Sequence, residues 1–336
     1  MPDLTKDSSK APQAGAASIV VLGTGGTIAG TGASAMSPID YRAAVLPVTQ
    51  LLASIPSLAG LPIRAEQLAQ IDSRDMSATV WRDLAKRCAE LLAQPQVQGI
   101  VVTHGTDTVE ETAFLLHQVL AADKPVVLTC AMRPATDLGS DGPQNLADAV
   151  AVANTRGAAG VMLVCAGRIH DAVHVSKVHH YRLDAFDSAD AGPIGFVEDG
   201  RVRLVRPWPS IGTGRGNPLA RWQAAELEAA ELPWVEILTS HACARGTAVQ
   251  LLRDAGVAGI VVAGTGNGSL HATLEAALLQ AQAHGIRVVR SSRCGAGRVL
   301  PGAADRLPST HLSPVKARIA LQLELLADGA GHLDAA

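Results

Sequence analysis

Residues 18–30 read SIVVLGTGGTIAG, an apolar run that opens into a glycine-rich loop. The run has the length and composition of a buried parallel strand. The loop therefore lies at a strand end, where α/β proteins keep their functional sites. Thr24 stands directly before Gly25 and Gly26, so the backbone can turn sharply there and expose its amide groups. We expect a site at this strand end, with a threonine hydroxyl as nucleophile.

Residues 99–108, GIVVTHGTDT, show the same pattern, because an apolar run is again followed by a loop that contains threonine beside glycine. A helical pattern begins at Val109, so the loop ends at a helix N-terminus, whose unpaired amides favour negative charge. This position suits a substrate carboxylate or a developing oxyanion. The alternative interpretation is that Asp107 or Thr108 only caps the helix.

Other interpretations of the first loop fit less well. A dinucleotide-binding loop reads Gly-x-Gly-x-x-Gly, and Ile28 stands where the third glycine belongs. A phosphate-binding loop needs Gly-Lys-Ser/Thr, which does not occur here. A purely structural turn from strand to helix stays open as an alternative.

The order of patterns along the 336 residues predicts an α/β protein of two domains. Val/Ile-rich runs alternate with Ala/Leu-rich helical patterns, which favours mostly parallel sheets flanked by helices. The expected strands are residues 18–23, 63–70, 99–103, 125–130, 160–165, 234–239, 258–263 and 286–291. The expected helices are residues 77–93, 109–121, 143–155, 246–255, 269–284 and 314–327. Ser77, Ser269 and Ser313 are the expected helix caps, with Pro314 at a first helical position.

A proline- and glycine-rich stretch divides these elements. Residues 206–218 carry three prolines and three glycines and read as part of a linker. We expect a large N-terminal domain at 18–207, a linker at 208–231 and a smaller C-terminal domain at 232–336. Residues 1–17 are polar and Ala-rich, which predicts a disordered tail.

Composition narrows the classes of partner. The net charge is −3 and no basic block occurs, which argues against nucleic acid. No apolar run reaches the roughly 18 residues that span a membrane. The first 17 residues lack the apolar stretch of a secretory signal, and the five widely spaced cysteines look like reduced thiols. We therefore expect a cytoplasmic protein.

Residues 174–180, HVSKVHH, contain a lysine and three histidines. A lysine that activates a hydroxyl must be partly desolvated, and the pattern alone leaves Lys177 open between that role and an exposed surface position. His170 and His174 would share a face only on a helix, whereas the pattern here is extended. Because no carboxylate or cysteine pattern completes a ligand set, we predict no metal site.

Together these motifs resemble the bacterial-type L-asparaginase family over nearly the whole chain beyond residue 17. The matching segments are 22–30 (LGTGGTIAG), 71–76 (IDSRDM), 103–112 (THGTDTVEET), 124–127 (KPVV), 131–134 (AMRP), 141–145 (DGPQN), 185–188 (AFDS), 192–195 (GPIG), 266–268 (GNG) and 291–293 (SSR). The resemblance implies hydrolysis of the side-chain amide of L-asparagine to L-aspartate and ammonia, with L-glutamine as a minor substrate. It implies no metal and no cofactor.

The resemblance also assigns catalytic roles. Thr24 matches the nucleophile, and Tyr41 matches a lid tyrosine that contacts that threonine. Thr106 matches a second catalytic threonine, Asp107 the carboxylate beside it, and Lys177 the lysine behind it. Proton transfer would pass through Tyr41 or through the Thr106–Lys177 pair.

Substrate-binding residues follow from the same resemblance. Ser73 matches the serine that binds the α-carboxylate, Asp107 also reaches the α-amino group, and Gly105 and Thr106 belong to the loop that holds the oxyanion. Asn267 matches an asparagine offered by the small domain of a neighbouring subunit. This implies a homotetramer built as a dimer of dimers.

Two positions depart from the family pattern. Arg74 stands where secreted, high-affinity members carry glutamine, and a cation beside an ammonium is unfavourable unless it turns away or pairs with an acid. We therefore predict weaker asparagine affinity than in the secreted type. Residues 294–305 lack a glutamate that some members lend across the subunit interface, and Asp305 is the candidate replacement.

Two rival functions are weaker. An amidase subunit that supplies ammonia to a tRNA-bound amino acid would carry an extra N-terminal domain, and here the first strand begins at Ser18. A catalytically silent binding module is disfavoured because the matched catalytic positions all keep functional side chains.

Overall fold

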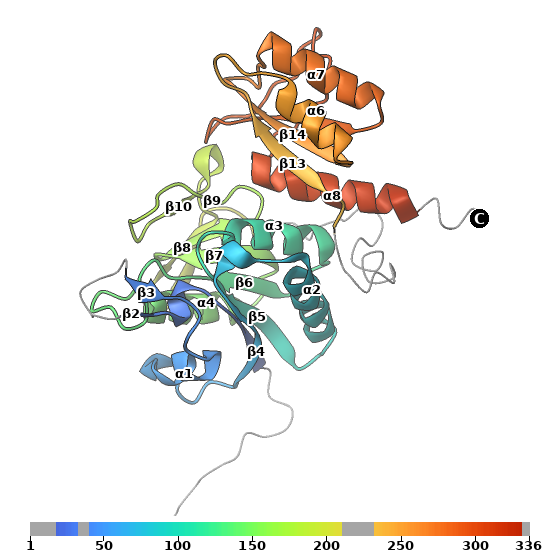
Figure 1. Ribbon diagram of the computed structural model, residues 1–336. Helices are drawn as coiled ribbons and strands as arrows, with labels where there is room; N and C mark the ends of the chain where they lie inside the picture. Colours follow the sequence, from blue (N-terminus) through green and yellow to red (C-terminus); the bar gives the residue numbers. More distant parts are fainter. Residues whose placement is uncertain (1–17, 33–39, 210–231, 331–336) are drawn as a thin grey trace, which may run out of the picture.

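The computed structural model describes residues 18–32, 40–209 and 232–330, which form two α/β domains (Figure 1). The predicted tail at 1–17 lies outside the described residues, as does nearly all of the predicted linker at 208–231. The N-terminal domain holds an eight-stranded sheet and the C-terminal domain a three-stranded sheet.

Five neighbouring strands of the N-terminal sheet are parallel, in the order β7-β6-β5-β1-β4. They are β1 Ser18–Gly25, β4 Ile63–Ile71, β5 Val97–Thr103, β6 Pro125–Thr129 and β7 Gly160–Cys165. Three antiparallel strands extend the sheet beyond β7: β8 Arg168–Asp171, β11 Gly195–Glu198 and β12 Arg201–Leu204. The parallel part brings the carboxyl ends of β1 and β5 side by side, with Gly23 opposite Thr103.

Helices cover both faces of this sheet. Val20 and Leu22 pack with α2 Ala78–Leu92 and α3 Val109–Val119, whereas Ile19 and Val21 pack with α1 Val48–Ala53 and α4 Gly142–Ala153. Because successive residues of a strand point to opposite faces, a strand buried on both sides reads as a continuous apolar run. This is why residues 18–22 predicted a buried parallel strand, which is β1.

The C-terminal sheet consists of β13 Val235–Thr239, β14 Gly259–Gly264 and β15 Arg287–Ser292, all parallel. Helices α6 Thr247–Asp254 and α7 Ala272–Ala283 cover one face. Helix α8, Pro314–Ala330, covers the other and lies between this sheet and α3 (Figure 1). Leu321 packs on the C-terminal sheet, while Ile319 and Leu323 join the N-terminal core. One helix thus belongs to the cores of both domains.

All eight predicted strands and six predicted helices are present, with ends shifted by a few residues. Ser77 caps α2 as predicted, since its side chain accepts a hydrogen bond from the Val80 amide. The predicted cap at Ser269 is wrong, because α7 begins at Ala272 and the His271 side chain caps it. Pro314 opens α8 as predicted, but the Ser313 hydroxyl has no hydrogen-bond partner within the described part of the chain.

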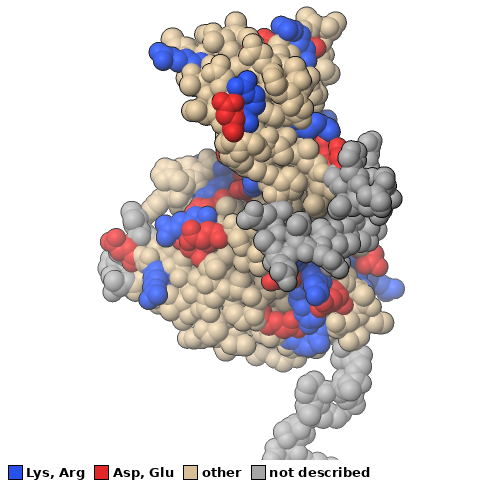
Figure 2. Space-filling model, turned by 45° about the vertical axis from the view of Figure 1, so that its right-hand side comes forward, with Lys and Arg blue, Asp and Glu red and all other residues tan. Residues whose placement is uncertain are grey.

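Acidic and basic side chains lie in mixed groups on the face drawn in Figure 2, with no continuous basic patch. Within the described ranges, no helix combines the length and apolar character that crossing a membrane requires.

Candidate active site

The loops that follow β1 and β5 touch each other through two glycines. Gly25 and Gly26 have φ values of 104° and 79°, and a Cβ on Gly26 would lie 2.3 Å from the Gly105 Cα atom. A side chain at either position would be strained or would push the loops apart. The glycines of the two signatures therefore bring both threonine-bearing loops to one place.

Thr24 lies near the end of β1, and its hydroxyl is directed at the end of β5. It is 1% exposed, and its hydroxyl donates a 2.8 Å hydrogen bond to the Thr103 main-chain oxygen. This bond joins the end of β1 to the end of β5. The proton of the Thr24 hydroxyl is thus engaged by the main chain rather than by a side chain that could remove it.

Thr27 carries the hydroxyl that meets the predicted lid tyrosine. It opens the 3₁₀ helix η1, Thr27–Ala29, and its Oγ1 lies 2.8 Å from the Tyr41 hydroxyl. Tyr41 belongs to β3, Tyr41–Arg42, which pairs with β2, Thr31–Gly32. The hairpin therefore places Tyr41 over Thr27, three residues beyond Thr24.

A second cluster joins the β5 loop to a strand far along the chain. The Lys177 Nζ atom donates to Thr106 Oγ1 at 2.8 Å and lies 2.6 Å from Asp107 Oδ1. Lys177 ends the short strand β9, Ser176–Lys177, which pairs with β10, Phe186–Asp187. The Lys177 side chain is only 18% exposed, so it does not lie free on the surface.

Ser73 packs against the loop that follows β5. It lies in η3, Ser73–Asp75, and is 2% exposed. Its hydroxyl accepts a 3.2 Å bond from the Asp107 amide, and a Cβ on Gly105 would lie 2.5 Å from that hydroxyl. The predicted carboxylate-binding serine therefore lies directly beside Gly105 and Asp107.

Arg74 turns toward neighbouring acids. Its side chain is 72% exposed, and its Nε atom lies 3.3 Å from an Asp72 oxygen and 3.8 Å from an Asp75 oxygen. Its charge is thus shared with two carboxylates in its own turn.

His104 is a buried part of the site that the sequence did not reveal. The Gly105 oxygen can only accept, so His104 Nδ1 carries the proton and donates to it. The Nε2 atom of the neutral ring then accepts from the Thr112 hydroxyl, which itself accepts from the Trp81 indole. Burial lowers the His104 pKa to about 4. A neutral histidine thus fixes the main chain of the loop that carries Thr106.

The other histidines have local partners. His170 bonds Ser188, His174 bonds Asp171 at 2.8 Å, and His179 stacks on His180. Among the described residues, no group of three or more acids, histidines or cysteines is placed to hold a metal ion.

Asn267 and Asp305 are held within the C-terminal domain. The Asn267 carboxamide exchanges two hydrogen bonds with the Leu300 main chain, at 2.9 and 2.7 Å. Asp305 pairs with Arg290 and accepts from the Gly302 amide. Within the described part of this one chain, no hydrogen bond or ion pair joins either side chain to the Thr27 or Thr106 loops.

Comparison with known proteins extends over both domains. Residues 18–210 match the family model "Asparaginase, N-terminal", and residues 234–331 match "Glutaminase/Asparaginase C-terminal domain". Glutaminase-asparaginase of Pseudomonas fluorescens biotype A is 38% identical, covering 92% of this chain and 86% of that protein. L-asparaginase 2 of Escherichia coli K12 is 37% identical, covering 91% and 88%. The crystal structure of a probable cytoplasmic L-asparaginase from Campylobacter jejuni has 38% identity and a TM-score of 0.85, covering 91% and 94%.

Proposed function

Since the chain belongs to the asparaginase family, we propose that it hydrolyses the side-chain amide of L-asparagine to L-aspartate and ammonia. The observation that carries this proposal is the meeting of two hydroxyl clusters at neighbouring strand ends. One is Thr27 with Tyr41, and the other is Thr106 with Lys177 and Asp107. Each cluster pairs a threonine hydroxyl with a group that can exchange its proton.

Thr27 is the proposed nucleophile, in place of Thr24, which the sequence favoured. A threonine hydroxyl needs a proton acceptor, and Tyr41 meets Thr27, whereas the Thr24 hydroxyl is bound to a main-chain oxygen. Thr27 Oγ1 attacks the amide carbon, and collapse of the tetrahedral intermediate releases ammonia and leaves an ester on Thr27. Water then cleaves the ester, giving L-aspartate and the free hydroxyl.

The Thr106 cluster supplies the second proton path and the oxyanion site. Lys177 donates to Thr106 Oγ1 and to Asp107, which gives the Thr106 hydroxyl a defined orientation, and the loop that carries Thr106 leads into the N-terminus of α3. A preorganised donor of this kind contributes typically about 2.7–4 kcal/mol to transition-state stability.

Ser73 and Asp107 are the proposed anchors for the amino-acid end of the substrate. The Ser73 hydroxyl accepts from the Asp107 amide, which leaves its proton for the α-carboxylate. The Asp107 carboxylate, 55% exposed, then takes the α-ammonium. Arg74 stays paired with its own acids, so we propose only a moderate weakening of affinity.

We also propose a homotetramer of two dimers, in which Asn267 of one subunit completes the site of its neighbour. Support comes from its place on an exposed loop of the C-terminal domain, between Gly266 and Gly268, both with positive φ. Mixing two inactive variants, Thr27→Val and Asn267→Ala, tests this idea. Shared sites would restore part of the activity after subunit exchange, whereas sites built from one chain would restore none.

Minor turnover of L-glutamine is expected, because discrimination of one methylene is usually worth only about 1–3 kcal/mol. We place the enzyme in the cytoplasm. Its five cysteines are all unpaired, and the Campylobacter structure is titled a probable cytoplasmic L-asparaginase, although a Haemophilus influenzae relative is named "Probable L-asparaginase periplasmic".

The matched pair Thr27→Val and Thr24→Val tests the proposed reaction, because each variant removes one hydroxyl and keeps the side-chain shape. Ammonia release from L-asparagine and from L-glutamine would be measured for both and for the wild type. We expect Thr27→Val to abolish turnover and Thr24→Val to retain most of it. Wild-type protein that releases no ammonia from either amino acid would exclude the function, and loss of turnover in Thr24→Val alone would exclude Thr27.

A further inference from the structure

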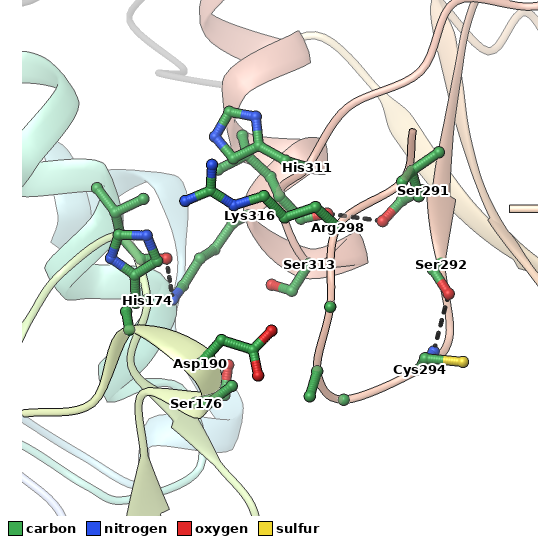
Figure 3. Close-up of a pocket in the computed structure, with 18 of the residues that line it drawn as sticks. His174, Ser176, Asp190, Ser291, Ser292, Cys294, Arg298, His311, Ser313 and Lys316 are labelled. Atoms are coloured by element: carbon green, nitrogen blue, oxygen red, sulfur yellow. Dashed lines mark hydrogen bonds between the residues drawn. The ribbon is translucent and has the colours of Figure 1, made fainter. Parts of the chain in front are cut away.

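Lys316 is a lysine of the C-terminal domain whose side chain is buried against the N-terminal domain. It lies in the first turn of α8 and is 1% exposed. Its ammonium donates to the main-chain oxygens of Val173, at 2.8 Å, and Val175. Figure 3 shows the side chain reaching from α8 toward His174. A buried cation is costly unless it is satisfied, so this position requires compensating partners.

The segment that Lys316 holds leads directly to the active site. Asp171 bonds the amides of Val173 and His174, so the turn is fixed at its start. Lys316 fixes the carbonyls that follow, and two residues beyond Val175 stands Lys177. The position of Lys177 therefore depends on a main-chain segment that is clamped from α8.

Glu110 interacts with the Lys177 main chain and is influenced by the Lys316 charge. It lies in the first turn of α3, and its Oε2 atom accepts a 2.8 Å bond from the Lys177 amide. Burial raises the pKa of Glu110, while the Lys316 charge is the largest influence that lowers it. Burial in turn lowers the Lys316 pKa to about 8, against the attraction of Glu110 and Asp171. Lys316 thus favours the carboxylate form that binds the Lys177 main chain.

We propose that Lys316 is a positioning residue for catalysis, which holds the main chain at Val173 and Val175 so that the Lys177 ammonium stays on Thr106 and Asp107. The proposal rests on the role of Lys177 in the proposed function. If Lys316 acts in this way, Lys177 reaches Thr106 correctly only while α8 is packed on the N-terminal domain.

Arg318 offers a matched control on the same helix. Its guanidinium bonds Glu111 at 3.1 Å, so it also joins α8 to α3 and also neutralises a carboxylate in the first turn of α3. Its partners are Glu111 and Trp81, and within the described residues no hydrogen bond or ion pair joins it to residues 173–177. A variant at Arg318 therefore weakens the docking of α8 without releasing the lysine segment.

The experiment compares Lys316→Met and Arg318→Met in the full-length protein. Steady-state ammonia release gives kcat and KM for L-asparagine. Brief acetylation with acetic anhydride, followed by peptide mass spectrometry, gives the reactivity of Lys177 relative to Lys124. Lys124 is a suitable internal standard, because its ammonium bonds the Leu92 and Gln94 oxygens, which neither variant touches.

We expect Lys316→Met to lower kcat on the order of 10–100-fold with little change in KM, since small misplacement of a catalytic group is costly. Acetylation of Lys177 rises in the same variant. Arg318→Met keeps kcat within about twofold, because Arg318 bonds Glu111 and not the segment that carries Lys177. Lys316→Gln, which keeps a polar side chain in the pocket, shows the same direction of change if Lys316→Met fails to fold.

Unchanged kcat and unchanged Lys177 labelling in the Lys316 variants would overturn the proposal. Equal loss of kcat in the Lys316 and Arg318 variants, without a change in labelling, would also overturn it and leave Lys316 as a docking residue only. Wild-type protein that releases no ammonia from asparagine would refute the proposed function instead, and the labelling comparison would still decide whether Lys316 positions Lys177.

Discussion

Replacing Tyr41 by phenylalanine removes the one atom that meets the Thr27 hydroxyl. The ring itself stays packed, since Gly30 leaves room for it: a Cβ at that glycine would lie 3.0 Å from a Tyr41 ring carbon. Tyr41→Phe therefore breaks the 2.8 Å hydrogen bond without removing the side chain from the hairpin.

The size of the decrease in kcat distinguishes whether the Tyr41 phenol transfers a proton or only orients Thr27. A positioned group that transfers a proton contributes typically about 10²–10⁴-fold to the rate, which corresponds to about 2.7–5.4 kcal/mol of barrier. A neutral hydrogen bond that only orients Thr27 is worth about 0.5–1.5 kcal/mol, or at most roughly 13-fold in rate. We expect kcat to fall by at least about 100-fold, because Tyr41 is the group that meets the Thr27 hydroxyl.

The assay is steady-state ammonia release from L-asparagine, with kcat and KM determined separately. Tyr181→Phe is the control, because the chain has two tyrosines and Tyr181 is 49% exposed. Tyr181→Phe should behave as wild type. A Tyr41→Phe enzyme whose kcat stays within tenfold of wild type would show that the phenol does not carry the Thr27 proton.

Three further predictions concern affinity, loop contact and pH. Arg74→Gln should lower KM for asparagine by no more than about fivefold. The exposed arginine is already paired with two acids, and exposed ion pairs are worth at most about 1 kcal/mol. A larger drop in KM would show that the Arg74 charge repels the substrate directly. Gly26→Ala should abolish activity and should lower the free energy of unfolding by more than Gly60→Ala does. Both glycines have positive φ, but only Gly26 lies against another loop, at Gly105. Equal decreases in the free energy of unfolding, measured in urea, would show that the contact with Gly105 does not matter. Burial lowers the pKa of His104 and of His170 to about 4, so between pH 6.5 and 4 the unfolded chain binds more protons than the folded one. As the pH falls through that window, the free energy of unfolding should decrease by up to about 1.4 kcal/mol per pH unit for each histidine. A free energy of unfolding that stays constant from pH 6.5 to 4.5 would contradict this prediction.

The regular elements of both domains were predictable because strands buried on both faces read as uninterrupted Val/Ile runs. The antiparallel extension of the sheet was not, since β11 and β12 are four residues long and carry charged side chains such as Glu198 and Arg203. Helix α1 was missed for a similar reason, as six residues give too few turns for a helical period.

The meeting of the two loops was predictable, because carboxyl ends of neighbouring parallel strands share one edge of a sheet. The contact of Thr27 with Tyr41, on which the proposal of Thr27 as nucleophile rests, was not predictable, since it follows a turn at Gly25 and Gly26 with positive φ. Lys316 carried no signal either. Its partners are main-chain oxygens 141 and 143 residues away, and carbonyls have no signature in a sequence.

The position of the covalent intermediate tests the central claim most directly. The enzyme would be mixed with L-asparagine, quenched in acid within one turnover, digested and analysed by fragmentation mass spectrometry, which distinguishes Thr24 from Thr27 within one peptide. We predict an aspartyl ester on Thr27 that is absent from Thr27→Val and present in Thr24→Val. An ester on Thr24, or one that persists in Thr27→Val, would contradict the account.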